Sequence, residues 1–335
     1  MKKILFYSSV KNIESFKTQQ FYCIDINLLR KCGNEVIVTN KIKPFLLSKY
    51  DASFIYFYRR GLIPALISFL RFKPVYFTGG IDALEKSYAS IKDYCIQKVL
   101  FHFCYWLSTK CIIVSDADME NVKCIYNNKI PYKIALSYHT IDVESFSCKY
   151  SCKEHGLFTT IVWMESKANV IRKGVDKALV VFKYLAEQQE YKNSKFVIIG
   201  KLGEGSDYLK ECAIKLNIID KIIFTGPVSE KDKVIWLKKS CYYFQLSLYE
   251  GFGLASLEAL ASKNIVIHTG KGGLKYSIKD FGVLIEGDEL SQEILNQIYM
   301  SLVSFDVQNL DIAALHVKDN FSNKKRQKDF ELIFN

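Results

Sequence analysis

The stretch EGFGLASLE, residues Glu250–Glu258, places two carboxylates on either side of a glycine-rich turn. It follows the run YYFQLSL, residues Tyr242–Leu248, which is short and rich in aromatic side chains, as is typical of a buried strand. After the turn, apolar residues recur with the spacing of the core-facing stripe of a helix, and Glu258 falls on that stripe. The segment therefore predicts a buried strand, a tight turn and a helix that carries one carboxylate on its buried side.

This arrangement suits a phosphorylated ligand. The first N–H groups of a helix have no partners within the helix, and the helix dipole favours an anion beside them. We therefore expect the amides of Gly251–Leu254 to face an anion. A carboxylate on a buried stripe is costly unless a hydrogen-bond donor meets it, and a sugar hydroxyl would be such a donor for Glu258. The stretch thus predicts a site for a phosphorylated sugar compound.

A second stretch adds positive charge to this hypothesis. In RKGVDK, residues Arg172–Lys177, two cations immediately precede a glycine and the expected start of a helix. Cations at that end of a helix oppose its dipole unless an anion lies between them. By themselves Arg172 and Lys173 are an ordinary surface feature, but together with Glu250–Glu258 they predict a phosphate clamp.

Both halves of the chain alternate apolar runs with helical stretches. The first half predicts strands at residues 3–8, 35–39, 53–57, 74–77 and 111–114 and a helix over 19–31; the second half predicts strands at 158–163, 195–199 and 221–224 and a helix over 175–189. Such alternation is typical of parallel sheets covered by helices, so we expect an α/β protein with two Rossmann-like, doubly wound domains facing across a cleft. The expected domains are 1–150, 151–320 and a closing helix, 321–335, that packs back toward the first domain.

The net charge of +11 over 335 residues is concentrated in the first half. Residues 1–150 contain 21 Lys and Arg against 12 Asp and Glu, and residues 151–335 contain 25 against 23. A basic half suits a membrane surface or an anionic acceptor, although a solvated surface explains it equally well. Nucleic acid is not expected as a partner, because the lysines are dispersed and no binding motif accompanies them.

Two observations concern location. No apolar run approaches the ~20 residues needed to cross a bilayer. The 10 cysteines are scattered without paired spacing, which suits a reducing compartment. We therefore expect a cytoplasmic protein that contacts the inner face of the cell membrane peripherally.

Other polar residues offer weaker signals. Asp82 follows a predicted strand in the basic half, where it would orient an acceptor or accept its proton, or merely cap a helix. Asp116 and Asp118 form an Asp-x-Asp pair, but acids there also suit the first turn of a helix, so no metal site is predicted. His102, amid aromatic residues, is expected in the core or an interface, and His139 near the domain junction.

With these motifs in view, the sequence resembles the retaining nucleotide-sugar glycosyltransferases of the GT-B fold, specifically glycosyltransferase family four, the glycosyl transferases group 1. The resemblance is strong over about residues 155–290. Its main piece is SLYEGFGLASLEALA at Ser247–Ala261, which matches the family's Glu-x7-Glu segment. Supporting pieces are RKGVDKAL from Arg172, FTGPVSEKD from Phe224 and GKGGLKYSI from Gly270.

The resemblance implies a nucleoside diphosphate sugar donor, UDP-linked by our expectation, and a hydroxyl acceptor on a cell-surface glycan or lipid-linked glycan, with no cofactor and no metal. Catalytic roles fall to Glu250, Lys173 and, in the acceptor half, Asp82. Glu250 would contact the donor sugar, Glu258 the ribose, and Lys173 the departing diphosphate. The remaining donor-binding residues implied are Arg172, Gly251, Phe252, Gly253 and Leu254 around the diphosphate and sugar, and Pro227 and Val228 beside the base.

The chain departs from the family pattern in three places. The usual Gly-Arg before the Lys-Gly pair is replaced by VWM at residues 162–164 and a longer polar loop, so Arg172 is the candidate replacement. The acceptor-domain strand is followed by TGG, residues 78–80, where a histidine is common. Gly272-Gly273 lacks the usual Pro-Glu after it. These departures keep two other hypotheses open, a non-catalytic nucleotide-sugar-binding protein and a nucleotide-sugar epimerase of the same fold.

Overall fold

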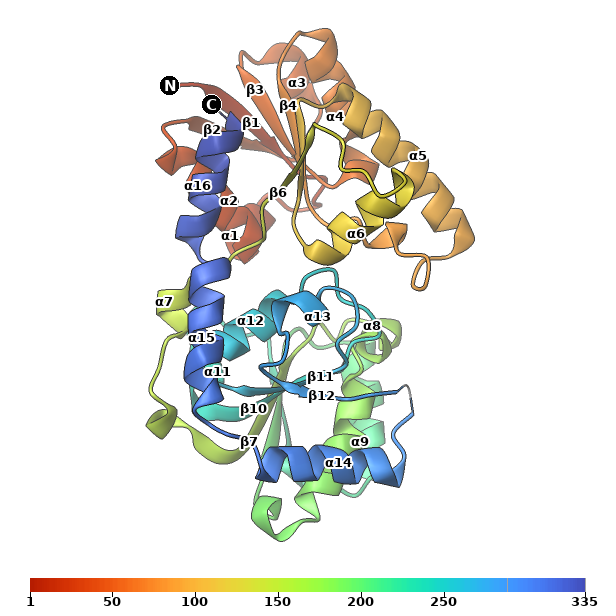
Figure 1. Ribbon diagram of the computed structural model, residues 1–335, viewed down its shortest axis with the longest axis vertical. Coiled ribbons are helices and arrows are strands. Elements are labelled where there is room, and N and C mark those ends of the chain that lie inside the picture. The colour runs from red at the N-terminus through yellow and green to blue at the C-terminus, as the bar shows by residue number, and fades with distance from the viewer. Residues whose placement is uncertain (288, 335) are drawn as a thin grey trace. The chain divides into compact units, whose positions relative to one another are not determined.

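The computed structural model describes residues 1–287 and 289–334. The chain forms two compact units: Met1–Ile141 together with Phe321–Asn335, and Asp142–Asn320. The chain leaves the first unit at Ile141, ahead of the polar stretch that suggested a boundary at residue 150. The end of the chain returns to the first unit, beside its beginning (Figure 1).

The first unit is built on a parallel six-stranded sheet in the order β2-β1-β3-β4-β5-β6. Its strands are β1 (Lys3–Tyr7), β2 (Glu35–Thr39), β3 (Ala52–Tyr56), β4 (Val75–Thr78), β5 (Lys110–Ile113) and β6 (Ile134–Leu136). Its helices are α1 (Ser15–Thr18), α2 (Gln20–Lys31), α3 (Lys43–Leu47), α4 (Tyr58–Leu70), η1 (Asp82–Leu84), α5 (Ile91–Leu107), α6 (Asp116–Ile125) and α16 (Asn323–Phe334). The five strands predicted here are confirmed to within two residues at each end.

Both faces of this sheet are buried. Because side chains alternate along each strand, neighbouring residues of one strand pack into opposite faces. Ile4 and Phe6 of β1 pack into a core with α2 and α16. Leu5 and Tyr7 of the same strand face the opposite way, into a core with α4 and α5. Figure 1 shows the two helix layers, with α2 and α16 on one side of the sheet and α4 and α5 on the other.

A buried ion pair fastens α16 to the first unit. The Arg326 guanidinium is fully buried and binds Asp25 of α2 with two parallel bonds, Nε to Oδ1 at 2.6 Å and Nη2 to Oδ2 at 2.7 Å. Its Nη1 donates to the carbonyls of Ser137 and Tyr138, at 2.5 and 2.8 Å. Tyr56 also donates to the Asp25 carboxylate. The charges are therefore paired and hydrogen-bonded on every side, which burial requires.

Replacement of Arg326 by Ala leaves Asp25 buried without its counter-ion. We expect this change to lower the free energy of unfolding by about 3–5 kcal/mol in urea titrations. Lys325→Ala is the matched control on the same helix, because Lys325 is exposed and lies 4.0 Å from Asp329; it should cost less than about 1 kcal/mol. Equal decreases in the free energy of unfolding of the two variants would show that the buried ion pair stabilises the fold no more than the exposed one.

The second unit is built on another parallel six-stranded sheet, in the order β12-β11-β10-β7-β8-β9. Its strands are β7 (Glu154–Ile161), β8 (Lys195–Ile199), β9 (Ile222–Gly226), β10 (Ser240–Gln245), β11 (Ile265–His268) and β12 (Val283–Leu284). Its helices are α7 (Val143–Phe146), η2 (Tyr150–Cys152), α8 (Lys167–Arg172), α9 (Val175–Ala186), η3 (Gln189–Tyr191), α10 (Glu204–Lys215), η4 (Ile219–Lys221), α11 (Glu230–Lys239), α12 (Leu254–Ala261), α13 (Leu274–Ser277), α14 (Gln292–Val303) and α15 (Asn309–Asn320). The polar loop expected after β7 in fact contains α8, capped by Ser166.

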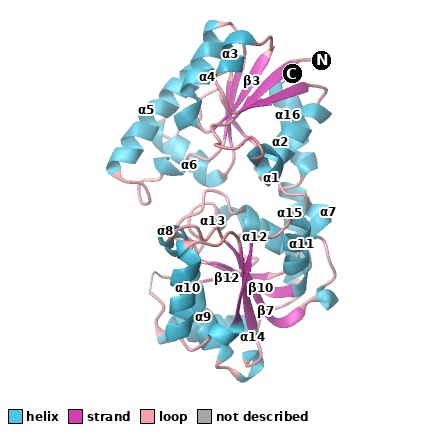
Figure 2. Ribbon diagram, turned by 180° about the vertical axis from the view of Figure 1, so that it is seen from behind, coloured by secondary structure: helices cyan, strands magenta, loops and turns pink. Residues whose placement is uncertain are grey.

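The strand order of the second sheet reverses between β7 and β10. From β7 the chain adds β8 and β9 on one side, then crosses over to add β10, β11 and β12 on the other (Figure 2). In open parallel sheets, the connections after the two strands at such a reversal run in opposite directions and leave a crevice at the carboxyl ends of the strands. Segments that follow β7 and β10 are therefore the first place to look for a ligand site.

Two general findings concern the described residues. All ten cysteines are free thiols. Within residues 1–287 and 289–334, the helices are too short or too polar to cross a bilayer.

Candidate functional site

Glu250 lies in the segment between β10 and α12 and is held by three donors. Its Oε1 accepts hydrogen bonds from Gln245 Nε2 at 2.9 Å and Ser247 Oγ at 3.0 Å, and it forms an ion pair with Lys173. The Glu250 side chain is 12% exposed, so a ligand group can reach it. The structure therefore brings together the two residues that the sequence placed in a clamp, one following β7 and one following β10.

Gly174 allows this meeting. A Cβ atom at this position would lie 1.9 Å from the carbonyl oxygen of Leu246, and its φ of +65° is a conformation that other residues rarely adopt. The amide of Leu248 donates to the carbonyl of Arg172 at 2.9 Å, which ties the same two segments together. Lys173 is thus positioned by main-chain contacts on both sides of it.

A glycine pair supports Glu250 from the other side. The amide of Gly273 donates to the Glu250 carbonyl at 2.6 Å. A Cβ atom at Gly273 would lie 2.4 Å from the carbonyl oxygen of Gly251, and one at Gly272 would lie 2.3 Å from that of Glu250. The GKGG stretch therefore packs directly on the turn that precedes α12.

The start of α12 retains its positive dipole end. The helix begins after Gly253, which has a φ of +89°, and its first turn contains no acidic residue. The helix dipole is therefore not neutralised by its own side chains and favours an anion. Leu254 to Ala261 form the helix that the sequence predicted, with Glu258 on its buried side.

Glu258 has a protein partner that the sequence did not reveal. It is 6% exposed, and its Oε1 accepts a hydrogen bond from Lys233 Nζ of α11 at 2.8 Å. Burial raises the pKa of Glu258, although Lys233 opposes this effect. Burial works to lower the pKa of Lys233, but Glu258 and Glu230 outweigh it and raise that pKa. The carboxylate predicted to need a sugar hydroxyl is therefore already met by a cation.

Lys233→Met keeps the apolar stem of this side chain and removes its charge. Glu258 would then bind its proton more tightly in the folded than in the unfolded chain, so stability is lost as the pH rises through the raised pKa of Glu258. We expect the free energy of unfolding of the variant to be about 3 kcal/mol lower than that of the unchanged chain at pH 8. The difference should be smaller at pH 5, and thermal unfolding measures it at both pH values.

Lys239→Met on the same helix is the control for this experiment, because its contact with Glu154 is exposed. It should show a small loss that is the same at both pH values. A loss in Lys233→Met that is equal at pH 5 and pH 8 would contradict an ionised Glu258.

The other residues expected at the donor site are Arg172, Pro227 and Val228, and no hydrogen bond or ion pair joins them to Glu250 among the described residues. Arg172 Nη2 donates to Asn169 Oδ1 of its own helix at 2.9 Å and is not among the donors to Glu250. Pro227 is exposed directly after β9. Val228 is half-buried and packs against the apolar cluster of β7 and β8. Pro227 and Val228 lead into α11, the helix that carries Lys233.

Asp82, the residue predicted for the acceptor half, belongs to the first unit. It opens η1 after β4, and the buried carboxyl group of Asp118 lies close by, because a Cβ atom at Gly80 would be 3.1 Å from Asp82 Oδ1 and 3.9 Å from Asp118 Oδ2. Burial, followed by the Asp82 charge, raises the pKa of Asp118 well above its usual value. The buried Asp118 carboxyl group therefore lies beside a second carboxyl group, and α6 starts at Asp116 as an ordinary capped helix.

The two histidines lie elsewhere than a catalytic role requires. His102 is exposed on α5, so the prediction of a core position is wrong, and an interface position stays a prediction. His139 is buried against Tyr56, with their rings stacked at 6.3 Å. Burial and the nearby Arg326 charge lower the pKa of His139 to about 3, so it stays neutral.

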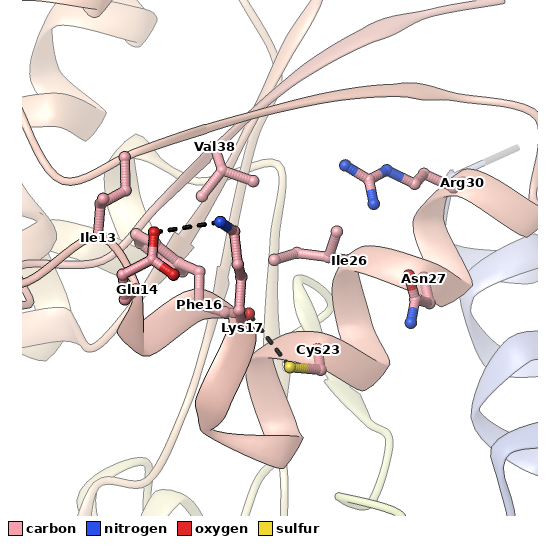
Figure 3. A pocket seen from close by; sticks show the side chains of 9 residues that line it. All are labelled: Ile13, Glu14, Phe16, Lys17, Cys23, Ile26, Asn27, Arg30 and Val38. Atoms are coloured by element: carbon pink, nitrogen blue, oxygen red, sulfur yellow. Dashed lines mark hydrogen bonds and ion pairs between the residues drawn. The ribbon is translucent and has the colours of Figure 1, made fainter.

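A separate hollow of about 440 Å³ lies in the first unit between α1, α2 and the edge strand β2 (Figure 3). Phe16, Ile26 and Val38 supply its apolar part, and Lys17 at its rim is paired with Glu14 at 3.1 Å. Since β1 and β3 separate β2 from β4, this hollow is not beside Asp82. Within the described residues, no three His, Cys, Asp or Glu side chains are arranged to hold a metal ion.

Sequence reasoning missed Lys233, Gln245 and Ser247, and it considered Asp118 only as part of an Asp-x-Asp pair. Gln245 and Ser247 gave a usable signal, since they are the polar members of an otherwise apolar strand and the segment after it. Lys233 gave no such signal, because a lysine three residues after Glu230 in a helix usually belongs to an exposed ion pair. Asp118 was concealed by its position in a first helical turn, where acids are common.

Comparison with known proteins bears on this site. Residues 165–299 match the family described as Glycosyl transferases group 1. The chain is 29% identical over 181 residues to an uncharacterized glycosyltransferase of Methanocaldococcus jannaschii, covering 51% of this chain and 45% of that protein. It is 33% identical over 129 residues to the alpha-monoglucosyldiacylglycerol synthase of Streptococcus pneumoniae, covering 38% of this chain and 29% of that protein. The chain thus spans less than half the length of these relatives.

A solved structure is similar over the whole chain. Anabaena HepE, in complex with UDP and glucose, has a TM-score of 0.75 and 16% identity, with 100% of this chain and 99% of that chain covered. This likeness and the two parallel sheets confirm the GT-B fold with two Rossmann-like units. The match to the glycosyl transferases group 1 covers residues 165–299, which include Lys173, Glu250 and Glu258.

Proposed function

We propose that this chain is a glycosyltransferase that moves a sugar from a nucleoside diphosphate sugar, UDP-linked, to a hydroxyl of a cell-surface glycan or lipid-linked acceptor, with retention of the anomeric configuration. The observation that carries the proposal is the pairing of Lys173 with Glu250 at the carboxyl ends of β7 and β10, beside the start of α12. The match of residues 165–299 to the glycosyl transferases group 1 supports it.

The donor is assigned to the second unit. Its diphosphate would lie against the start of α12 and the Lys173 ammonium group, where the helix dipole and a cation both favour negative charge. The Glu250 carboxylate would accept hydrogen bonds from the sugar hydroxyls through Oε2, since Oε1 already has three donors. Glu258, paired with Lys233, would accept hydrogen bonds from the ribose hydroxyls.

The chemistry asks the protein to stabilise a leaving group. The bond between the sugar C1 and the β-phosphate oxygen breaks, and its electrons remain on the diphosphate. The acceptor oxygen then forms the new bond to C1 on the same face and gives its proton to the departing phosphate oxygen. Lys173 and the α12 amides stabilise the charge that develops, so the reaction needs no carboxylate nucleophile.

The acceptor is assigned to the first unit. Asp82 would accept a hydrogen bond from the acceptor hydroxyl and orient it. Burial and the Asp82 charge disfavour a second negative charge on the neighbouring Asp118. The excess of Lys and Arg in residues 1–150 suits an acceptor held at an anionic membrane surface, consistent with a cytoplasmic protein bound peripherally.

Lys173→Ala and Glu250→Ala should each reduce sugar transfer by about 10²–10³-fold, because each removes a charge placed for the transition state or the donor sugar. The assay is transfer from labelled UDP-sugars, with the anomeric configuration of the product read by NMR.

Lys183→Ala, in an exposed pair on α9, is the control and should keep full activity. Normal turnover in the Lys173 or Glu250 variant would contradict the assignment of that residue to the site. An interconverted donor sugar formed without any acceptor would instead identify an epimerase, and donor binding with neither reaction would identify a binding protein.

Donor identity can be tested by ligand-induced stabilisation. A nucleotide sugar that binds only the folded chain adds about 2.7 kcal/mol at a concentration of 100 times its Kd. We expect UDP-sugars to raise the unfolding temperature and GDP-sugars to do so less. A larger effect of GDP-sugars would overturn the assignment of a UDP-linked donor.

A further inference from the structure

The helices α4 and α5 turn apolar side chains toward solvent. They pack against each other on one face of the first sheet, and the rings of Phe69 and Trp106 join them at 5.1 Å. Their outward residues are between 43% and 66% exposed; these are Ile63, Leu66 and Leu70 of α4 and Val99, Phe103 and Trp106 of α5. We call this set the α4–α5 face. A helix that is apolar on its outer side as well as its inner side is expected where something other than water covers it.

Phe72 extends this face and has no reason in the fold to be a phenylalanine. It follows α4 with a φ of 56° and is 95% exposed. The amide of Phe72 donates to the Phe69 carbonyl and that of Lys73 to the Ser68 carbonyl, both at 2.9 Å, which is the helix-ending pattern that normally places glycine here. A bulky side chain in this conformation is unfavourable and buries nothing, so its benefit must come from outside the chain.

The α4–α5 face also includes a shallow apolar hollow. About 520 Å³ is bounded by the outward residues of α5, with Lys98 at its rim. In Figures 1 and 2, α5 lies on the outer side of the first unit's helix layer, with the sheet behind it. Val99, Phe103 and Trp106 are each more than half exposed, so this face is open to solvent.

Positive charge accompanies the apolar residues. Residues 58–73 and 91–110 contain a single acid, Asp93, which is paired with Arg59 at 3.2 Å. The same segments contain seven cations, namely Arg59, Arg60, Arg71, Lys73, Lys92, Lys98 and Lys110. Apolar and aromatic residues beside Lys and Arg are the combination that binds the headgroup region of anionic bilayers.

We propose that the α4–α5 face and Phe72 dock this protein on an anionic lipid bilayer. Phe72, Leu70 and Trp106 enter the headgroup region, and the neighbouring Lys73 and Lys98 contact lipid phosphates. The proposal deepens the proposed function. Docking itself does not depend on that function; only the reason for docking, access to a lipid-linked acceptor, rests on it. Phe72 and Trp106 precede β4 and β5, whereas Asp82 follows β4, so these docking residues and Asp82 lie at opposite edges of the sheet.

A second copy of the chain is the less suitable occupant. A symmetric dimer places the same patch on both partners, so the excess of cations would face itself across the interface. Like charges brought together cost free energy, whereas anionic lipid headgroups neutralise them. Charge therefore favours the bilayer.

The test is co-flotation of the full chain with vesicles of phosphatidylcholine and phosphatidylglycerol in a 3:1 ratio, without donor or acceptor. We expect binding that weakens on pure phosphatidylcholine vesicles and with added salt. Phe72→Gly should lower the vesicle partition coefficient about tenfold, while its unfolding temperature stays the same or rises, since glycine suits the φ of this position. Lys73→Gln with Lys98→Gln should lower binding to the anionic vesicles only.

Leu332→Gln is the matched control, because Leu332 is 82% exposed on α16, across the sheet from the α4–α5 face. It should bind vesicles as the unchanged chain does. Absence of vesicle binding, or equal binding by Phe72→Gly, would overturn the proposal; so would a dimer, detected by light scattering, that Phe72→Gly dissociates. Because no donor is present, stabilisation by UDP-sugars reports on the proposed function separately.

Discussion

The close approach of Gly174 to Leu246 is the constraint on which the candidate site depends. No side chain fits between these two stretches of main chain, so the segment after β7 lies against the end of β10. This contact places Lys173 at Glu250 and sets both beside the start of α12. Gly272 and Gly273 make similarly close main-chain contacts on the other side of Glu250. The site is thus formed by backbone packing at the reversal of strand order, and its charges are positioned by that packing.

Charge burial organises both units in different ways. In the first unit, Arg326 and Asp25 are fully buried and satisfied by fixed partners, which fastens the end of the chain to α2 and the core. In the second unit, Lys233 bridges Glu258 and Glu230 at the edge of the core. The first pair is closed to ligands, whereas the second retains one exposed partner, Glu230. This difference fits a structural role for Asp25 and a binding role for Glu258.

Surface and core follow different rules in α4 and α5. Their inner sides pack on the sheet in the usual way, with Phe101 and Cys104 fully buried. Their outer sides carry exposed apolar residues beside Lys and Arg, and Phe72 occupies a position that backbone geometry assigns to glycine. Folding explains the inner residues but leaves the outer ones unexplained, which is why the outer residues indicate a partner.

The sequence by itself determined the elements and the two halves of the clamp. Apolar periodicity is a local property, so strands such as β1 and β8 and the helix after Glu250 could be placed without knowing what they touch. Glycine spacing likewise located the turn before α12. Pairings between distant residues depended on the tertiary structure, because strand order and helix packing decide which side chains meet. Only the folded chain could show that Glu258 meets Lys233, that Asp118 lies buried beside Asp82, and that the end of the chain returns to Asp25 through Arg326.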